Sequence, residues 1–173
     1  MAGQMAVTAV LMGVSGAGKS SLMAALVERA HLASAEGDDF HPQANVAKMR
    51  AGTPLTDADR WPWLRAIADW IGHREAASVD AVVTCSALRR AYRDVLRDGH
   101  PSVRFVHLTT TRIVLEERLA ARIGHYMPGS LLASQLELLE PLDADEPGFE
   151  VNVDRPIPEL ADEIARRLRF DVT

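Results

Sequence analysis

One eight-residue segment near the start of the chain limits the possible folds more than any other feature, because it matches the phosphate-binding pattern G-x-x-x-x-G-K-[ST]. Its residues are Gly13, Val14, Ser15, Gly16, Ala17, Gly18, Lys19 and Ser20. Such a loop connects a strand to a helix. The apolar run 7–12 predicts a buried strand before it, and 20–30 predicts a helix after it. Because the glycines and the helix N-terminus present backbone N–H groups to phosphate oxygens, we expect residues 13–20 to bind the phosphates of a nucleotide.

The last two residues of the loop have separate predicted roles. In this pattern the lysine, here Lys19, reaches the β- and γ-phosphates, and the hydroxyl of the next residue, Ser20, binds Mg²⁺. Of the 19 lysines and arginines in the chain, only Lys19 and Lys48 are lysines. A compact ammonium fits under a phosphate where a planar guanidinium does not, so the choice of lysine here supports the phosphate role.

The composition predicts one domain that occupies residues 1–173. A chain of 173 residues with 47% hydrophobic residues is long enough for one full core and short for two. Its net charge of −5 argues against non-specific binding to nucleic acid or to an anionic membrane. The single cysteine, Cys85, excludes a disulfide framework, and no apolar run approaches the length of a membrane span, so we expect a cytoplasmic protein.

Apolar runs and helical patterns alternate along the chain. Runs 81–85, 103–108 and 149–153 predict three more strands, and 30–36 predicts a weaker one. Together with 7–12 they predict an α/β fold with a five-stranded parallel sheet flanked by helices.

Two groups of side chains on predicted helices have structural interpretations. Apolar residues recur at helical spacing after residue 57 and predict a core-facing stripe, so we interpret its tryptophans as structural: Trp63, Ile67, Trp70 and Ile71. Four arginines share another helix, and we interpret them as a solvated polar face, with phosphate contact by one of them left open: Arg89, Arg90, Arg93 and Arg97.

Two acidic residues, Asp38 and Asp39, follow the predicted strand 30–36. Ligands bind at the carboxyl ends of parallel strands, so this position is expected to lie near the phosphates. The alternative is that an aspartate caps the helix that starts near Pro42, and both roles are compatible. His41 and Lys48 lie at helical spacing, so they would share one face of that helix.

Three classes of nucleotide-binding protein compete at this stage: a small-molecule kinase, a GTPase switch and a nucleic-acid-stimulated ATPase. The N-K-x-D motif by which a GTPase reads its base is absent, since neither lysine follows an asparagine. The strand at Val82 ends in Cys85-Ser86-Ala87 instead of the Asp-Glu of a motor ATPase. A kinase, which needs a phosphate clamp and an acceptor pocket, fits the remaining residues best.

Further motifs give the chain a resemblance to the gluconokinase family that covers nearly its whole length. They are Gly13 to Ser20, Gly37-Asp38-Asp39-Phe40-His41-Pro42, Asn45, Lys48-Met49, Gly52-Thr53-Pro54-Leu55-Thr56-Asp57, Asp59-Arg60, Pro62-Trp63-Leu64, Cys85-Ser86-Ala87-Leu88, Tyr92-Arg93, Arg118-Leu119, Arg122, Gly124-His125, Ser134-Gln135 and Leu138-Leu139-Glu140-Pro141. One departure is Glu36, which stands where related sequences often carry Asp. Either carboxylate could hold a metal-bound water, so the role of Glu36 stays open.

The resemblance implies that ATP and Mg²⁺ phosphorylate the terminal hydroxyl of D-gluconate to give 6-phosphogluconate. It places the acceptor-binding segment at about 38–65 and a mobile lid at about 118–135. Lys19, Asp38 and Arg122 would be catalytic, and the acceptor would be bound by Asp38, His41, Lys48 and Arg60. Arg60 is the residue chosen for the substrate carboxylate, because a guanidinium binds a carboxylate through two hydrogen bonds.

Several alternatives remain open at this stage. Asp38 either accepts the proton of the acceptor hydroxyl or holds Mg²⁺ through water. Arg118 either contacts phosphate or lies on a helix surface. The substrate could be another small hydroxy acid, as in shikimate kinase, or the chain could be a non-catalytic nucleotide switch. Whether the protein is a homodimer is open as well.

Overall fold

A computed structural model describes residues 5–122 and 129–172, and the side chains of residues 129 and 130 are not described. Its centre is one sheet of five strands in the order β2-β3-β1-β4-β5, and every neighbouring pair is parallel. The strands are β1 (Thr8–Met12), β2 (Ala33–Glu36), β3 (Ala81–Thr84), β4 (Val103–Thr109) and β5 (Gly148–Asn152). The α/β fold with a five-stranded parallel sheet is therefore confirmed, including the weak strand that the sequence placed at 30–36.

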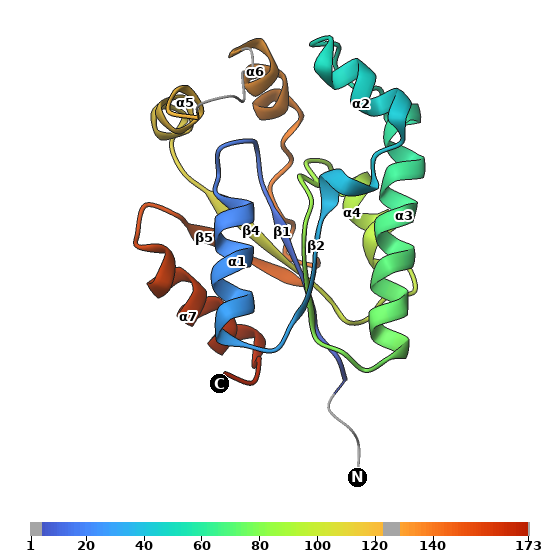
Figure 1. The fold of residues 1–173 in the computed structure, drawn as a ribbon, viewed down its shortest axis with the longest axis vertical. Helices are drawn as coiled ribbons and strands as arrows, with labels where there is room; N and C mark the ends of the chain where they lie inside the picture. Colours follow the sequence, from blue (N-terminus) through green and yellow to red (C-terminus); the bar gives the residue numbers. More distant parts are fainter. Residues whose placement is uncertain (1–4, 123–128, 173) are drawn as a thin grey trace.

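Helices cover both faces of this sheet (Figure 1). They are α1 (Lys19–Arg29), α2 (Gln43–Arg50), α3 (Asp57–Ala76), α4 (Arg90–Arg97), α5 (Arg112–Ala120), α6 (Gly129–Leu138) and α7 (Ile157–Leu168), with a short 3₁₀ helix, η1 (Gly37–Phe40). Figure 1 shows α1 and α7 on one side of the sheet and α3 and α4 on the other. None of the described helices has the length and apolar content needed to cross a membrane.

Burial on both faces explains why the sequences of the central strands β1 and β3 are almost wholly apolar. All five residues of β1 are buried. Because successive side chains of a strand point to opposite faces, Leu11 belongs to the core that contains α1 and α7, whereas Met12 belongs to the core that contains α3 and α4. The predicted stripe on α3 is also confirmed: Trp63, Ile67 and Ile71 are buried, and Trp70 packs against the same core.

The predicted solvated arginine face is wrong for Arg93, which is fully buried. Its guanidinium donates to both carboxylate oxygens of Glu146, at 2.6 and 2.9 Å, and to the backbone carbonyls of Ala87, Glu140 and Pro141. A buried charge is tolerated only when it is paired and fully hydrogen-bonded, and these partners meet that condition. Arg93 therefore fixes the segment that follows α6 against the start of α4.

Candidate active site

A cleft of about 310 Å³ lies at the carboxyl ends of β1, β2 and β3. This is the end of a parallel sheet at which ligands bind. Its lining comes from six parts of the chain: the phosphate-binding loop, the end of β2 with the turn after it, the segment 49–55, the first turns of α3, the end of β3 with the segment that follows it into α4, and α6 with Arg122. Lys19, Asp38, His41, Arg60 and Arg122 all line it, so the structure brings together five of the residues that the sequence singled out.

The phosphate-binding loop has the backbone that its glycines predict. Gly13, Gly16 and Gly18 have φ angles of 141°, 86° and 95°, in the left-handed region that favours glycine. At Gly13 a Cβ would also lie 2.9 Å from the carbonyl oxygen of Leu108, so a side chain is excluded by contact as well as by backbone conformation. Helix α1 begins at Lys19, directly after Gly18, and points its N-terminus into the loop.

Lys19 places a partly buried ammonium group on the wall of the cleft. Its Nζ donates to the carbonyl oxygens of Gly13, at 2.9 Å, and Val14, at 3.1 Å. Burial lowers the pKa of Lys19 to about 8, although the negative charge of Asp38 acts in the opposite direction. Burial raises the pKa of the nearby Cys85 thiol to about 12, so Cys85 is protonated and unreactive at neutral pH.

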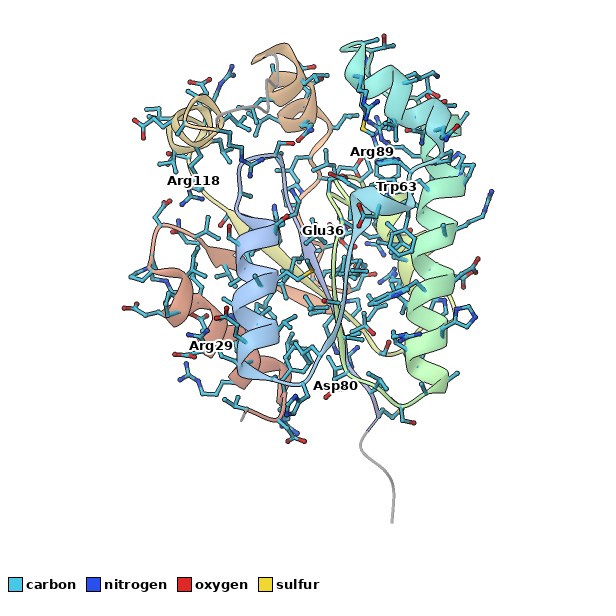
Figure 2. The ribbon with its side chains drawn as sticks, viewed as in Figure 1. Arg29, Glu36, Trp63, Asp80, Arg89 and Arg118 are labelled. Atoms are coloured by element: carbon cyan, nitrogen blue, oxygen red, sulfur yellow. The ribbon has the colours of Figure 1, made fainter. Side chains whose placement is uncertain are left out.

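Two side chains from distant segments brace the loop, and the sequence predicted neither contact. Gln135 of α6 accepts from the backbone N–H of Ser15 at 2.8 Å and donates to the Ser15 hydroxyl at 3.1 Å. Arg118 donates to the carbonyls of Ala17, at 3.4 Å, and Val153, at 3.2 Å, and so joins the loop to the end of β5. Figure 2 shows Arg118 reaching from α5 toward this region. The only sequence signal for Gln135 was its place in the family motif.

The turn after β2 is held by a close approach of two backbones. At Gly37 a Cβ would lie 1.9 Å from the carbonyl oxygen of Thr84, so only glycine fits. The backbone N–H of Gly37 donates to the Thr84 hydroxyl at 3.1 Å, and that hydroxyl donates to Glu36 at 2.5 Å. The indole N–H of Trp63 donates to the Gly37 carbonyl at 2.7 Å. Figure 2 labels Glu36 and Trp63 near this turn, between the sheet and α3.

Asp38 follows this turn directly and presents its carboxylate to the cleft. The side chain is 91% exposed, and its Oδ1 lies 3.9 Å from Nε2 of His41. Pro42 occupies the N-cap of α2, and no side chain in the described part of the chain caps that helix, so the capping alternative for Asp38 and Asp39 is wrong. Glu36 also lines the cleft, where its carboxylate accepts from Thr84.

The α3 side of the cleft carries a second cation, Arg60. Its Nη1 lies 3.2 Å from the hydroxyl of Tyr92 and 3.8 Å from Oδ1 of Asp57. The Tyr92 hydroxyl donates to that same carboxylate at 2.5 Å, and Arg89 donates to its other oxygen at 3.3 Å. One carboxylate therefore faces two guanidinium groups, which leaves excess positive charge beside the cleft.

His41 precedes α2, so the prediction that it shares a face of that helix with Asn45 and Lys48 is wrong, although Nδ2 of Asn45 lies 3.2 Å from its Nδ1. Neither Asn45 nor Lys48 lines the cleft. The ammonium of Lys48 lies 2.8 Å from both carboxylate oxygens of Asp59. This hydrogen bond is the main reason that the pKa of Asp59 falls to about 2. Of the three, only His41 reaches the cleft wall.

The predicted lid, residues 118–135, is only partly described. Arg122 is exposed, lines the cleft and lies at the edge of the described residues. The segment that would contain its glycine hinge, residues 123–128, lies outside them. The lid therefore stays a prediction.

Protonation of Lys19 gives a direct test of its contact with phosphate. A triphosphate stabilises the ammonium form and raises a pKa that is near 8 in the free protein. Lys19 is mostly charged at about pH 7.5 and mostly neutral at about pH 9, so ATP binding should take up more protons at the higher pH. Calorimetry in buffers of different ionisation enthalpy measures this uptake. Equal uptake at both pH values, or the same pH-dependent rise in the Lys19→Arg variant, whose guanidinium keeps its proton, would contradict the contact.

Comparison with known proteins identifies the relatives of this chain. A family model described as an AAA domain matches residues 9–142. A gluconokinase of Gluconobacter oxydans is 45% identical over 162 residues, with 94% of this chain and 91% of that protein covered. The thermoresistant gluconokinase of Escherichia coli is 41% identical over 149 residues, with 86% and 85% covered.

Solved structures agree with these sequence matches. An unliganded sugar kinase from Janibacter sp. HTCC2649 is 45% identical, with a TM-score of 0.90 and 95% of each chain covered. A gluconokinase from Sinorhizobium meliloti 1021 is 44% identical, with a TM-score of 0.84 and 96% of this chain and 93% of that chain covered. On these sequence and structural similarities, the chain belongs to the gluconokinase family of P-loop kinases.

Proposed function

We propose that this protein transfers the γ-phosphoryl group of ATP to the terminal hydroxyl of D-gluconate. The observation that carries the proposal is that the phosphate-binding loop and Arg60 line one and the same cleft, with Asp38 also on its wall. In-line transfer requires the two substrates to lie side by side, and phosphoryl-transfer enzymes act mainly by positioning and by stabilising charge. The gluconokinase names of the relatives support gluconate as the acceptor.

In the proposed reaction the acceptor oxygen forms a bond to the γ-phosphorus as the bond to the β,γ-bridging oxygen breaks. ADP leaves with that oxygen, and the hydroxyl proton goes to a base or to solvent. Lys19 and Arg122 contribute positive charge on the nucleotide side of the cleft, as their positions on its wall suggest. Arg60, with Tyr92 and Asp57 holding its guanidinium, binds the carboxylate of the acceptor.

The donor groups in the cleft fit Mg²⁺. The Ser20 hydroxyl and the carboxylates of Glu36 and Asp38 all line it, and hard oxygen donors of this kind are what Mg²⁺ prefers. Mg²⁺ usually keeps several waters and binds phosphate oxygens together with few protein ligands, so Ser20 with a nearby carboxylate is a sufficient set. When bound, the ion supplies charge that offsets the phosphate oxygens.

The family resemblance predicted that Lys48 binds substrate. We propose instead that Lys48 supports the helix that carries Arg60. Its ion pair with Asp59 supports the start of α3, because Asp59 also accepts from the backbone N–H and hydroxyl of Thr56 in a capping box. Lys48 thereby holds the helix that presents Arg60. The cytoplasmic location stays a prediction, and whether the protein is a homodimer stays open.

Acceptor-dependent ADP formation tests the proposed function. We expect ADP release only when ATP, Mg²⁺ and gluconate are all present, because water alone is a poor substitute for a positioned acceptor. A panel of sugar acids and of other hydroxy acids, including shikimate, measured by a coupled ADP assay, distinguishes the acceptor classes. Faster turnover with shikimate would favour the hydroxy-acid alternative. Slow ADP release that no acceptor accelerates would indicate a nucleotide switch and contradict a kinase.

A separate measurement decides the role of Asp38. If its carboxylate accepts the acceptor's proton, Asp38→Asn should lower kcat about 10²-fold or more, with the KM for ATP near its wild-type value. The activities of the wild-type protein and of Asp38→Asn are then compared at increasing Mg²⁺ concentrations. Recovery of the variant at high Mg²⁺ would assign Asp38 to the metal and exclude it as the base.

A further inference from the structure

The imidazole of His41 lies in a site that keeps it neutral. Its side chain is 3% exposed, and its ring stacks on the indole of Trp63 with centroids 4.2 Å apart and planes 15° apart. Burial lowers the pKa of His41 below its usual value, and Arg60 acts in the same direction while Asp38 acts against it. The ring therefore carries one proton at neutral pH, and the function of His41 depends on which nitrogen holds it.

The contacts of Asn45 determine which ring nitrogen of His41 carries that proton. Asn45 is itself 2% exposed, and its Nδ2 lies 2.9 Å from the backbone carbonyl oxygen of Asp59. A carbonyl only accepts, so this contact fixes the amide with its nitrogen toward Asp59. The same Nδ2 lies 3.2 Å from Nδ1 of His41. Because an amide nitrogen only donates, Nδ1 must accept and carries no hydrogen.

The remaining proton is consequently on Nε2, the nitrogen nearer Asp38. The distance from Nε2 to Oδ1 of Asp38 is 3.9 Å, which is too long for a direct hydrogen bond. Among the residues that the structure describes, no carboxylate therefore lies at bonding distance from Nε2–H, and His41 lines the cleft. An oxygen of a bound acceptor can accept from it.

We propose that His41 binds an oxygen of the acceptor as a neutral Nε2–H donor, and that Asn45 is the positioning residue that sets this tautomer. The inference rests on the proposed kinase function and refines it: His41 holds the acceptor and does not take its proton. The backbone of Asp59 belongs to the same arrangement, because Lys48 and Thr56 hold its carboxylate while its carbonyl orients Asn45. The network thus runs from α3 through α2 to the cleft.

Nuclear magnetic resonance of ¹⁵N-labelled protein measures the tautomer without any substrate. We expect two-bond ¹H–¹⁵N spectra of the free wild-type protein to show His41 neutral and protonated on Nε2, with the resonances assigned by their loss in His41→Phe. In Asn45→Asp the carboxylate accepts instead of donating, so a proton should appear on Nδ1. A wild-type ring protonated on Nδ1, or a tautomer unchanged in Asn45→Asp, would overturn the proposal.

Steady-state kinetics then test whether the Nε2–H group of His41 contributes to the binding of gluconate. Asn45→Asp should raise the KM for gluconate by several-fold to about tenfold and leave the KM for ATP near its wild-type value. Gln43→Glu adds the same charge at an exposed position of α2 and reports the effect of charge alone. If Gln43→Glu raised the gluconate KM equally, the tautomer would not be the cause.

Two further variants separate the hydrogen bond from the packing. His41→Gln keeps a donor near the position of Nε2, whereas His41→Phe keeps a ring against Trp63 and has no donor. We expect kcat/KM for gluconate to be several-fold to about tenfold higher in His41→Gln than in His41→Phe. Equal or better activity of the phenylalanine variant would overturn the proposal. A wild-type protein that forms no gluconate-dependent ADP would refute the proposed function instead, and the spectra would still decide the tautomer.

Discussion

The close contact between the backbones of Gly37 and Thr84 organises the acceptor side of this protein. No Cβ fits between them, so the chain leaving β2 passes directly over the end of β3. The turn is then held by the Thr84 hydroxyl and by the indole N–H of Trp63. As a result, Asp38 and His41 reach the cleft from positions that the sheet and α3 both fix.

Charge in the cleft is distributed in a way that suits the transfer of a group between two anions. Lys19 lies in the phosphate-binding loop and Arg60 on the first turns of α3, while the carboxylates of Glu36 and Asp38 belong to the end of β2 and the turn after it. Two anionic substrates repel each other, so each needs its own cation to bind close to the other. Burial strengthens these interactions, and the lowered pKa of Lys19 reflects the cost of holding a cation there before phosphate arrives.

Local sequence patterns were sufficient to predict the fold and the phosphate-binding loop. The burial of the central strands, the start of α1 after the loop and the left-handed backbone of the loop glycines depend on neighbouring residues, and those expectations are confirmed. Contacts between distant segments were not predictable in the same way. Arg93 was misplaced on a solvated face because its partner Glu146 is 53 residues away, and the contact of Gln135 with Ser15 spans 120 residues. A substrate-binding role for His41 was predicted partly from its position after a strand end. Its tautomer, however, depends on the side-chain amide of Asn45, which the carbonyl of Asp59 orients.

The most direct test of the account is the effect of Arg60 on the two Michaelis constants. If one cleft holds the nucleotide on the loop and the acceptor's carboxylate on Arg60, Arg60→Ala should raise the gluconate KM about tenfold or more. A lost charge-assisted hydrogen bond is worth about 1.5 to 3 kcal/mol, and the ATP KM should stay nearly unchanged. Arg65→Ala removes an exposed arginine of the same helix and serves as the matched control. A rise in the ATP KM alone, or equal effects of the two variants, would contradict the account.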